Sequence, residues 1–349
     1  MSLLALLAGT ALALAAGEVL LRLLRPAQLA IVRYPCVYTP DAVLGYRYLP
    51  GATGRVAAHF EIDNPVAINS LGFYDDEPAA GDASPRVLAA GDSFTAAMNV
   101  PIDRVWTSVV ERALREGGSP RADVVNLGID GTGTDVHVAL LREHIGRLAP
   151  DAVVLAFFAN DVGDVVRGRF ERECHAGFVL SYQTPAQRDA LRARVDAHRQ
   201  KWARILLFDT SYLARLAGAA LLPRGSPFRM EFQQIARAEL GEPDRAAGRQ
   251  RLRAALADLE ALAATCGCRV IVAPVPTLRH PRGSLDMWQR YAADVAVEVV
   301  DVLPAIERER AARGLRHRDL YFEHDNHLNE IGNELYGRAV AEALLRSAR

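Results

Sequence analysis

The sequence predicts an α/β fold in which helices cover both faces of a parallel sheet. From residue 86 onward, short apolar runs of strand length alternate with longer segments of helical periodicity. This alternation is typical of parallel sheets. Half of the 349 residues are hydrophobic, which is enough for one large domain or two small ones with a sizeable core.

The expected elements follow one another in order along the chain. Apolar runs predict strands at residues 86–90, 123–127, 152–158, 269–274 and 297–302. Helical periodicity predicts helices at residues 104–116, 134–148, 246–265 and 330–346. The segment between the third and fourth strands, residues 162–245, is too long for a simple crossover. We therefore expect a helical insertion there, with a helix at 185–204, beside the carboxyl ends of the strands where ligands of such sheets bind.

The part of the chain before the first strand of this sheet differs in composition. Residues 26–85 are rich in Pro, Gly, Tyr and Asp and contain short β-like stretches such as 55–62. We interpret them as a stalk or small β extension. The predicted organisation is an N-terminal membrane anchor or signal at 1–25, the extension at 26–85, and one α/β domain at 86–349.

The N-terminal segment is apolar from residue 3 to 24 apart from Gly9, Thr10, Glu18 and Arg22. A helix that spans a bilayer needs about 20 mostly apolar residues. The segment lacks the positively charged start that is typical of a secretory signal peptide. We expect an uncleaved membrane anchor, with a cleaved signal peptide and a buried amphipathic helix as the alternatives.

Charge and cysteine content limit the possible partners. The chain has 41 basic and 42 acidic residues and a formal net charge of -1, whereas binding to nucleic acid requires a strongly basic face. The four cysteines are Cys36, Cys174, Cys266 and Cys268. Their spacing does not resemble a zinc site, and Cys266 and Cys268 are too close in sequence for an easy disulfide. Neither nucleic acid nor zinc is expected as a partner.

The first candidate for chemistry is Ser93, which follows the strand at 86–90 directly within Gly91-Asp92-Ser93-Phe94-Thr95. A serine at the end of a parallel strand lies at the usual active-site edge, and its hydroxyl needs a nearby base. The alternative is a turn in which Asp92 and Ser93 only cap the next helix. The nucleophile elbow Gly-x-Ser-x-Gly is absent, so the α/β-hydrolase fold is disfavoured.

Two further loops follow the second and third strands. In the first, the spacing of Gly128, Gly131 and Gly133 does not fit the dinucleotide fingerprint. A backbone N–H there can stabilise an oxyanion, although a plain glycine turn or a phosphate-binding loop is also compatible with the sequence. In the second, the side-chain amide of Asn160 can donate to a developing negative charge. An Asn-Asp turn is the alternative.

The fourth candidate is the segment His324-Asp325-Asn326-His327 before the last helix. A histidine that serves as a base for a serine also needs a carboxylate to orient it and to stabilise its charged form. A metal site is disfavoured because the helical spacing His-Glu-x-x-His is missing. A polar cap for the last helix is the remaining alternative.

Taken in order, Ser93, Gly131, Asn160 and His327 resemble the four blocks of the SGNH (GDSL-like) hydrolase family. The resemblance covers residues 86–346 and implies a flavodoxin-like three-layer α/β/α sandwich. It assigns Ser93 as nucleophile and His327 as general base. It also implies an oxyanion hole formed by Ser93, Gly131 and Asn160, with no metal or organic cofactor.

Residues 69–73 also resemble a segment that precedes the nucleophile in membrane-anchored members of this family. The membrane-anchored type implies that the domain lies outside the cytoplasm. Arg22, Arg25 and Arg33 follow the apolar segment, and by the positive-inside rule they indicate the opposite orientation. Both orientations therefore stay open at this point.

The last block departs from the family, which usually has an aspartate three residues before the histidine. Here that position is His324, and Asp325 stands two residues before His327. A carboxylate is anionic at neutral pH and only accepts hydrogen bonds, whereas a histidine brings no compensating charge. We therefore predict that Asp325 is the third member of the triad, with a role as helix cap as the alternative.

The resemblance implies a serine esterase that acts on acyl esters, including O-acetyl groups of an envelope or exported polysaccharide, through an acyl-serine intermediate. An O-acyltransferase with the same residues and a catalytically silent binding protein on the same fold are the alternatives. We expect the insertion at 162–245 to shape the acyl or glycan pocket and to supply no essential acid or base.

Overall fold

The computed structural model describes residues 3–346 except 80, 82, 201–206, 208, 222–234 and 239–242. Its centre is a five-stranded sheet in the order β12-β11-β7-β5-β6, in which every neighbouring pair is parallel. The strands are β5 Arg86–Gly91, β6 Asp123–Asn126, β7 Ala152–Ala156, β11 Arg269–Val272 and β12 Glu298–Val299. In chain order this is the 2-1-3-4-5 arrangement of flavodoxin-like folds. The expected α/β fold is thereby confirmed, although the last strand is only two residues long.

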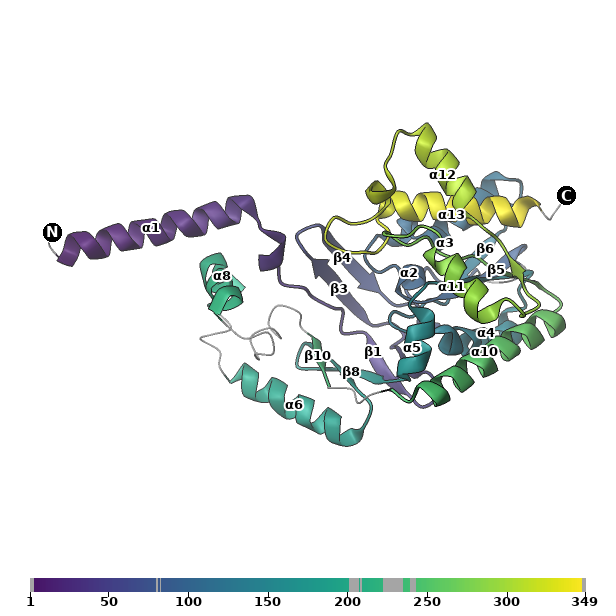
Figure 1. Ribbon diagram of the computed structural model, residues 1–349, viewed down its shortest axis with the longest axis horizontal. Helices are drawn as coiled ribbons and strands as arrows, with labels where there is room; N and C mark the ends of the chain where they lie inside the picture. Colours follow the sequence, from purple (N-terminus) through teal and green to yellow (C-terminus); the bar gives the residue numbers. More distant parts are fainter. Residues whose placement is uncertain are drawn as a thin grey trace.

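Helices form the outer layers of the domain (Figure 1). On one side, α3 (Trp106–Glu116) packs against α13 (Glu330–Arg346), and on the other α10 (Arg245–Thr265) packs against α4 (Thr134–Leu148). Close packing has a local cause at Gly337, where a Cβ would lie 2.6 Å from the carbonyl oxygen of Trp106. The remaining helices of the domain are α2 Ser93–Ala96, α11 Gly283–Ala292 and α12 Leu303–Ala312, with 3-10 turns at Ala27–Leu29, Ile102–Arg104 and His317–Leu320.

The extension at 26–85 is part of this domain and does not form a stalk. It folds into two antiparallel hairpins, whose strands are β1 Tyr38–Asp41, β2 Gly45–Tyr48, β3 Thr53–Ala58 and β4 Ile62–Ala67. Val37, Tyr46, Tyr48 and Ile68 are buried in the same hydrophobic core as the central sheet. Of the two expectations for 26–85, a stalk or a small β extension, the stalk is therefore wrong. The segment forms β hairpins whose aromatic and aliphatic residues pack into the core of the domain.

The insertion holds strands as well as helices. Its elements are α5 Asp161–Arg167, β8 Glu171–His175, β9 Phe178–Tyr182, α6 Pro185–Arg199, α8 Tyr212–Leu221 and β10 Ile235–Arg237. The three strands form a small sheet in the order β10-β9-β8. Thr184 and Gln187 form a capping box that starts α6, and residues 201–204 of the helix expected there lie outside the described residues. The insertion is thus mixed α/β and not helical alone.

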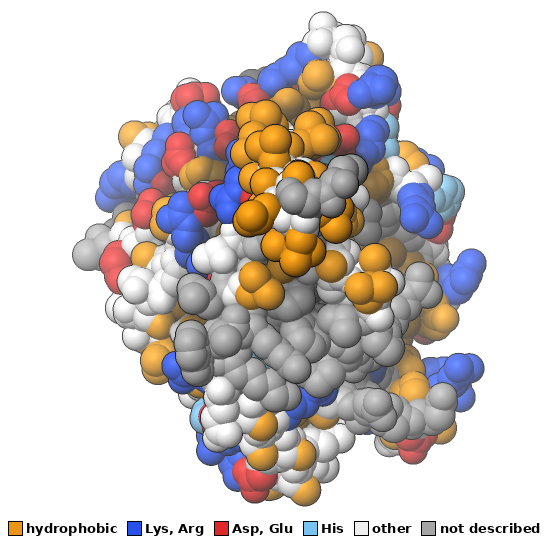
Figure 2. Space-filling view, turned by 90° about the vertical axis from the view of Figure 1, so that its left-hand side faces the viewer, with side chains coloured by type: hydrophobic (Ala, Val, Ile, Leu, Met, Phe, Trp, Pro, Cys, Tyr) orange, Lys and Arg blue, Asp and Glu red, His pale blue; other side chains and the backbone are white. Residues whose placement is uncertain are grey.

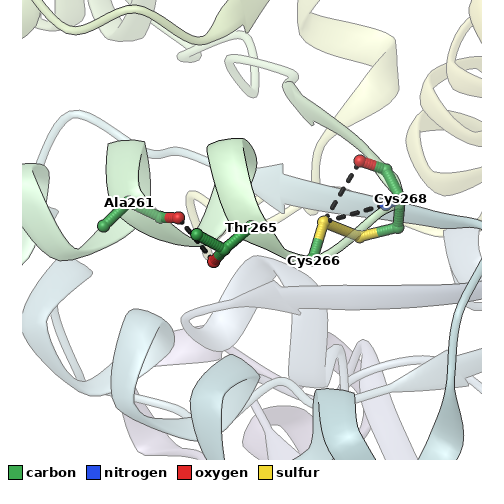
Figure 3. The surroundings of a disulfide bond; sticks show 4 residues. All are labelled: Ala261, Thr265, Cys266 and Cys268. Atoms are coloured by element: carbon green, nitrogen blue, oxygen red, sulfur yellow. Dashed lines mark hydrogen bonds between the residues drawn. A yellow bond between two sulfur atoms is a disulfide. The ribbon is translucent and has the colours of Figure 1, made fainter.

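A disulfide joins Cys36 of the extension to Cys174 of the insertion. A second disulfide joins Cys266 and Cys268, just after α10 (Figure 3). The expectation that these two cysteines are too close to pair is wrong. Gly267 between them has a φ of +66°, a left-handed conformation that glycine adopts readily. The turn leaves the two Cα atoms 5.2 Å apart, within the usual range for a disulfide.

Helix α1 (Leu3–Leu24) extends away from the domain, and none of its residues is buried (Figure 1). With 22 residues and a mean hydropathy of 2.0, it is long and apolar enough to cross a membrane. Figure 2 shows the hydrophobic side chains gathered on the side from which α1 projects. The charge that interrupts the segment has a structural role: the Glu18 carboxylate accepts hydrogen bonds from the backbone N–H of Tyr212 and Leu213. These bonds tie α1 to the first turn of α8.

Candidate active site

Ser93 begins a one-turn helix directly beyond the end of β5. Asp92 caps that helix, because its Oδ1 accepts a hydrogen bond of 2.9 Å from the backbone N–H of Phe94. A Cβ on Gly91 would lie 2.2 Å from Oγ1 of Thr95, so the turn is closed tightly over the last residue of the strand. The result is a short, buried support that presents the half-buried Ser93 at the carboxyl edge of the sheet.

Asn126 fastens this turn to the loop after β6. Its side-chain amide donates to the carbonyl oxygen of Thr95 at 2.8 Å, and its Oδ1 accepts from the N–H of Gly128 at 2.9 Å. A Cβ on Gly128 would lie 2.2 Å from the backbone nitrogen of Ala96. The sequence interpretation did not assign this role to Asn126, although an amide at the end of an apolar strand was the available signal.

His327 lies in a loop that hydrogen bonds hold from two sides. The side-chain amide of Asn329 donates to two backbone carbonyl oxygens of the preceding turn, at 3.0 Å each. From the other side, the Glu61 carboxylate in the β3–β4 turn accepts from the backbone N–H groups of Glu323 and His324, at 2.7 and 2.8 Å. The extension therefore helps to position the loop that carries the predicted base.

Ser93, His327 and Asp325 lie in hydrogen-bond contact with one another. Nε2 of His327 is 2.8 Å from Oγ of Ser93, and Nδ1 of His327 is hydrogen-bonded to Oδ1 of Asp325. The same carboxylate oxygen accepts from the backbone N–H of His327 at 2.8 Å. The ring of His324 lies beside the ring of His59, 6.1 Å between centroids. Of the two residues that competed for contact with His327, Asp325 is the one that makes it.

The charges around His327 favour its protonated form. Burial opposes that form, but the hydrogen bond and the negative charge of Asp325 outweigh it and raise the pKa of His327 above its ordinary value. Burial by itself would raise the pKa of Asp325, yet its contacts with His327 hold the pKa below the usual range. The carboxylate is therefore ionised at neutral pH and can stabilise an imidazolium formed during a reaction.

Gly131 and Asn160 line a second cavity of about 430 Å³, next to the one that contains Ser93. Gly131 has a φ of +69°, and a Cβ there would lie 2.7 Å from Nη2 of Arg172. Asn160 caps α5 and is exposed. The structure thus brings Gly131 and Asn160 together in this cavity, whereas Ser93, His327 and Asp325 line the other one.

The cavity at Ser93, which we call the Ser93 cavity, has a volume of about 190 Å³ and is lined by Ser93, His327 and Asp325. The opposite wall comes from the extension and includes the apolar or aromatic residues Val32, Tyr34, Tyr38, Val56, Ala58 and Ile62. Among the described residues that line it, none belongs to the insertion. The sequence interpretation missed this wall, for which a β-like stretch at 55–62 was the only signal.

An ion pair separates the two cavities. Nη1 of Arg172 lies 2.5 Å from Oδ2 of Asp130, and Asp130 lines the Ser93 cavity whereas Arg172 lines the second one. The hydroxyl groups of Tyr38 and Tyr48 donate to Oδ1 of Asp130, at 3.1 and 2.8 Å. Arg172 was not a candidate at the sequence level, because it lies far along the chain in the insertion.

The chain is similar to several known proteins. The chain is 36% identical over 96 residues to an arylesterase of Vibrio mimicus, which covers 28% of this chain and 48% of that protein, about half its length. Similar solved structures include an α/β hydrolase enzyme from the metagenome of Lake Arreo, at 15% identity and a TM-score of 0.41 over 75% of this chain and 96% of that one. Another is an acetylxylan esterase from Geobacillus stearothermophilus, at 15% identity and a TM-score of 0.38 over 76% and 95%.

The model of the GDSL-like lipase/acylhydrolase family matches residues 89–335, which is well over half of the chain. The match begins within β5 and ends within α13, so it includes Ser93, Gly131, Asn160, Asp325 and His327. The chain therefore belongs to the GDSL-like lipase/acylhydrolase family.

Proposed function

We propose that this protein is a serine esterase that cleaves acyl esters through an acyl-serine intermediate. The observation that carries the proposal is the continuous hydrogen-bonded arrangement from Oγ of Ser93 through both ring nitrogens of His327 to Asp325. A serine hydroxyl becomes a useful nucleophile when a base accepts its proton and a third group orients that base. All three parts are present in contact here.

The reaction proceeds in two steps. His327 accepts the proton of Ser93 as Oγ attacks the ester carbonyl, and the imidazolium then gives that proton to the departing alcohol. The N–H groups of Ser93 and Gly131 and the side chain of Asn160 stabilise the oxyanion. In the second step His327 removes a proton from water as the water oxygen attacks the acyl-serine, and it then gives that proton to Oγ of Ser93 as the carboxylic acid leaves. Asp325 orients His327 and stabilises its charge in both steps.

The proposed substrates are esters with a short acyl chain, including O-acetyl groups on a polysaccharide. The small volume of the Ser93 cavity, about 190 Å³, and its apolar wall from the extension support a short acyl group. Exposure of Asn160 at the adjacent cavity leaves room for the alcohol part of a larger molecule.

We also propose that α1 anchors the protein in a membrane and that the domain lies outside the cytoplasm. The bridge between Cys36 and Cys174 supports this orientation, because structural disulfides persist in oxidising compartments. Two arginines at the end of α1 contact the rest of the chain: Arg22, in its last turn, donates to the carbonyl oxygen of Thr210, and Arg25, just after it, lies over the ring of Phe60. Fractionation tests the anchor. We expect that only detergent releases the protein from the membrane fraction. Full recovery of the intact, uncleaved chain in the soluble fraction after lysis contradicts the anchor.

Turnover by the Ser93→Ala variant tests the esterase proposal. We expect loss of hydrolysis of p-nitrophenyl esters and acetylated glycans with an unchanged circular dichroism spectrum, whereas Ser119→Ala, a serine in the turn before β6, keeps its activity. Retention of most of the rate in Ser93→Ala contradicts the proposal. Comparison of free acetate with acetate transferred to an added glycan separates an esterase from an acyltransferase.

A further inference from the structure

The second cavity, beside Gly131 and Asn160, is lined by three arginines, and we call it the arginine pocket. They are Arg167 from α5, Arg172 from β8 and Arg237 from β10. The insertion thus brings guanidinium groups from three elements to the side of the site that carries the proposed oxyanion donors. The mechanism above uses none of these arginines.

The carboxylates around the pocket do not balance these charges. Arg172 is paired with Asp130, and Arg167 with Asp164 at 2.6 Å. The guanidinium group of Arg237 has no hydrogen-bond or ion-pair partner within the described part of the chain. Two buried carboxyl groups near Asp164, those of Asp92 and Asp161, do not line the pocket. Burial raises the pKa of Asp161 well above its usual range, so Asp161 adds little negative charge. Burial raises the pKa of Asp92 only to about 6, so Asp92 stays largely ionised at neutral pH, and its Oδ1 accepts from the backbone N–H of Phe94.

Arg172 is held in place before any ligand arrives. Its side chain is buried, with its guanidinium 4.5 Å from the ring centroid of Tyr46 and 5.2 Å from that of Phe170. Its Nε has no hydrogen-bond partner within the described structure. A buried N–H without a partner is costly, and a planar guanidinium suits carboxylate and phosphate oxygens. Arg172 therefore combines a fixed position with an unused donor.

From this arrangement we infer that the arginine pocket binds an anionic group of the ester substrate, a carboxylate or a phosphate, with Arg237 as its main charged partner. This inference rests on the proposed esterase function, and it adds a substrate class to that function. Gly131 and Asn160, the proposed oxyanion donors, line this same pocket, so the anion belongs to the part of the substrate that extends past the ester carbonyl on that side. The Ser93 cavity, with its apolar wall, takes the other part.

Kinetics on matched esters test the inference. For the alcohol side, phenyl acetate is compared with 4-acetoxybenzoate and 4-acetoxyphenyl phosphate, which separates carboxylate from phosphate. For the acyl side, p-nitrophenyl butyrate is compared with p-nitrophenyl hemisuccinate. We expect at least one anionic ester to exceed its neutral partner about tenfold in kcat/KM, equivalent to about 1.4 kcal/mol. Arg237→Gln removes most of that advantage.

Arg121→Gln is the matched control, because Arg121 is exposed just before β6, at the opposite edge of the sheet from Ser93. The control keeps the ratio of anionic to neutral ester. Equal kcat/KM for every pair in the wild type, or an unchanged ratio in Arg237→Gln, overturns the inference while leaving the esterase proposal intact.

Binding without turnover separates the two proposals. In the full-length Ser93→Ala variant, calorimetry measures the affinity for 4-acetoxybenzoate, 4-acetoxyphenyl phosphate and p-nitrophenyl hemisuccinate. We expect at least one to bind, and added Arg237→Gln to weaken that binding about tenfold. Absence of binding by all three, or binding unaffected by Arg237→Gln, overturns the inference. If instead an anionic ester binds in an Arg237-dependent way but the wild type hydrolyses no ester, the inference stands and the esterase proposal is contradicted.

Discussion

Two regions meet at Ser93, and they are built in different ways. The candidate catalytic edge consists of short turns placed directly after the buried parallel strands β5, β6 and β7, together with the loop that precedes α13. The cavity walls consist of an antiparallel hairpin from the extension and a small sheet from the insertion. The first region holds groups suited to bond making, whereas the second surrounds the substrate.

This difference separates rate from affinity. Changes at the catalytic edge remove interactions that strengthen in the transition state and so lower kcat, whereas changes in the walls alter ground-state binding and so raise KM. The following four predictions use that contrast, starting with the largest expected effect.

At the catalytic edge, Asp325→Asn is expected to lower kcat by about 10⁴, the size of effect seen when an orienting carboxylate is replaced by its amide. His324→Ala is the matched control and leaves kcat close to normal, because the His324 ring lies beside His59. Both are measured at saturating substrate, with folding checked by circular dichroism. If His324→Ala loses most of its kcat while Asp325→Asn stays near normal, Asp325 does not orient His327.

Asn160→Ala is expected to lower kcat by about 10²–10³, because one donor to the oxyanion is lost. Steady-state kinetics with a p-nitrophenyl ester give kcat and KM separately. If KM increases and kcat stays unchanged, Asn160 only binds substrate and does not stabilise the oxyanion.

In the walls, replacement of Cys36 and Cys174 together by serine is expected to raise KM and leave kcat nearly unchanged. The bridge holds the extension, whose Tyr34 and Pro35 line the Ser93 cavity, to β8 of the insertion. Its loss also lowers the free energy of unfolding by about 2–4 kcal/mol, which a thermal melt detects.

The double replacement of Cys266 and Cys268 is the control for this measurement, since that bridge follows α10 and neither cysteine lines the Ser93 cavity (Figure 3). If KM rises equally in both double variants, the Cys36–Cys174 bridge has no specific effect on the wall of the Ser93 cavity.

The smallest effect concerns pH. In the proposed reaction His327 acts as a base in its neutral form, so we expect kcat/KM to rise with pH through the pKa of His327, which lies above the ordinary value of about 6.5. Asp325→Asn removes the negative charge that raises this pKa, so the midpoint of the residual activity moves to lower pH. A midpoint that stays in place or moves upward shows that another group titrates.

The sequence predicted the two regions unequally for a physical reason. Ser93, Gly131 and Asn160 each lie in the turn or loop that follows an apolar strand, and the carboxyl ends of parallel strands share one edge. Asp325 was selected by charge alone, and the structure places its carboxylate on Nδ1 of His327. These signals are local, so they can be read without knowledge of the tertiary structure.

The walls depend on contacts between distant segments. Strand β8 has the charged sequence Glu-Arg-Glu-Cys-His. Because it contains no apolar run, the sequence does not predict a strand there or its pairing with β9. Whether Ile62 faces Ser93 depends on how the β3–β4 hairpin packs on the domain. The conformation of Gly267, which permits the bridge after α10, is likewise visible only in the folded chain.

Covalent labelling of Ser93 tests the central claim most directly. The full-length protein is treated with a fluorophosphonate, digested and mapped by mass spectrometry. The account predicts one adduct on the peptide that contains Ser93, absent in Ser93→Ala and formed far more slowly in Asp325→Asn. An adduct on a different residue, or equal labelling of the wild type and Ser93→Ala, contradicts it.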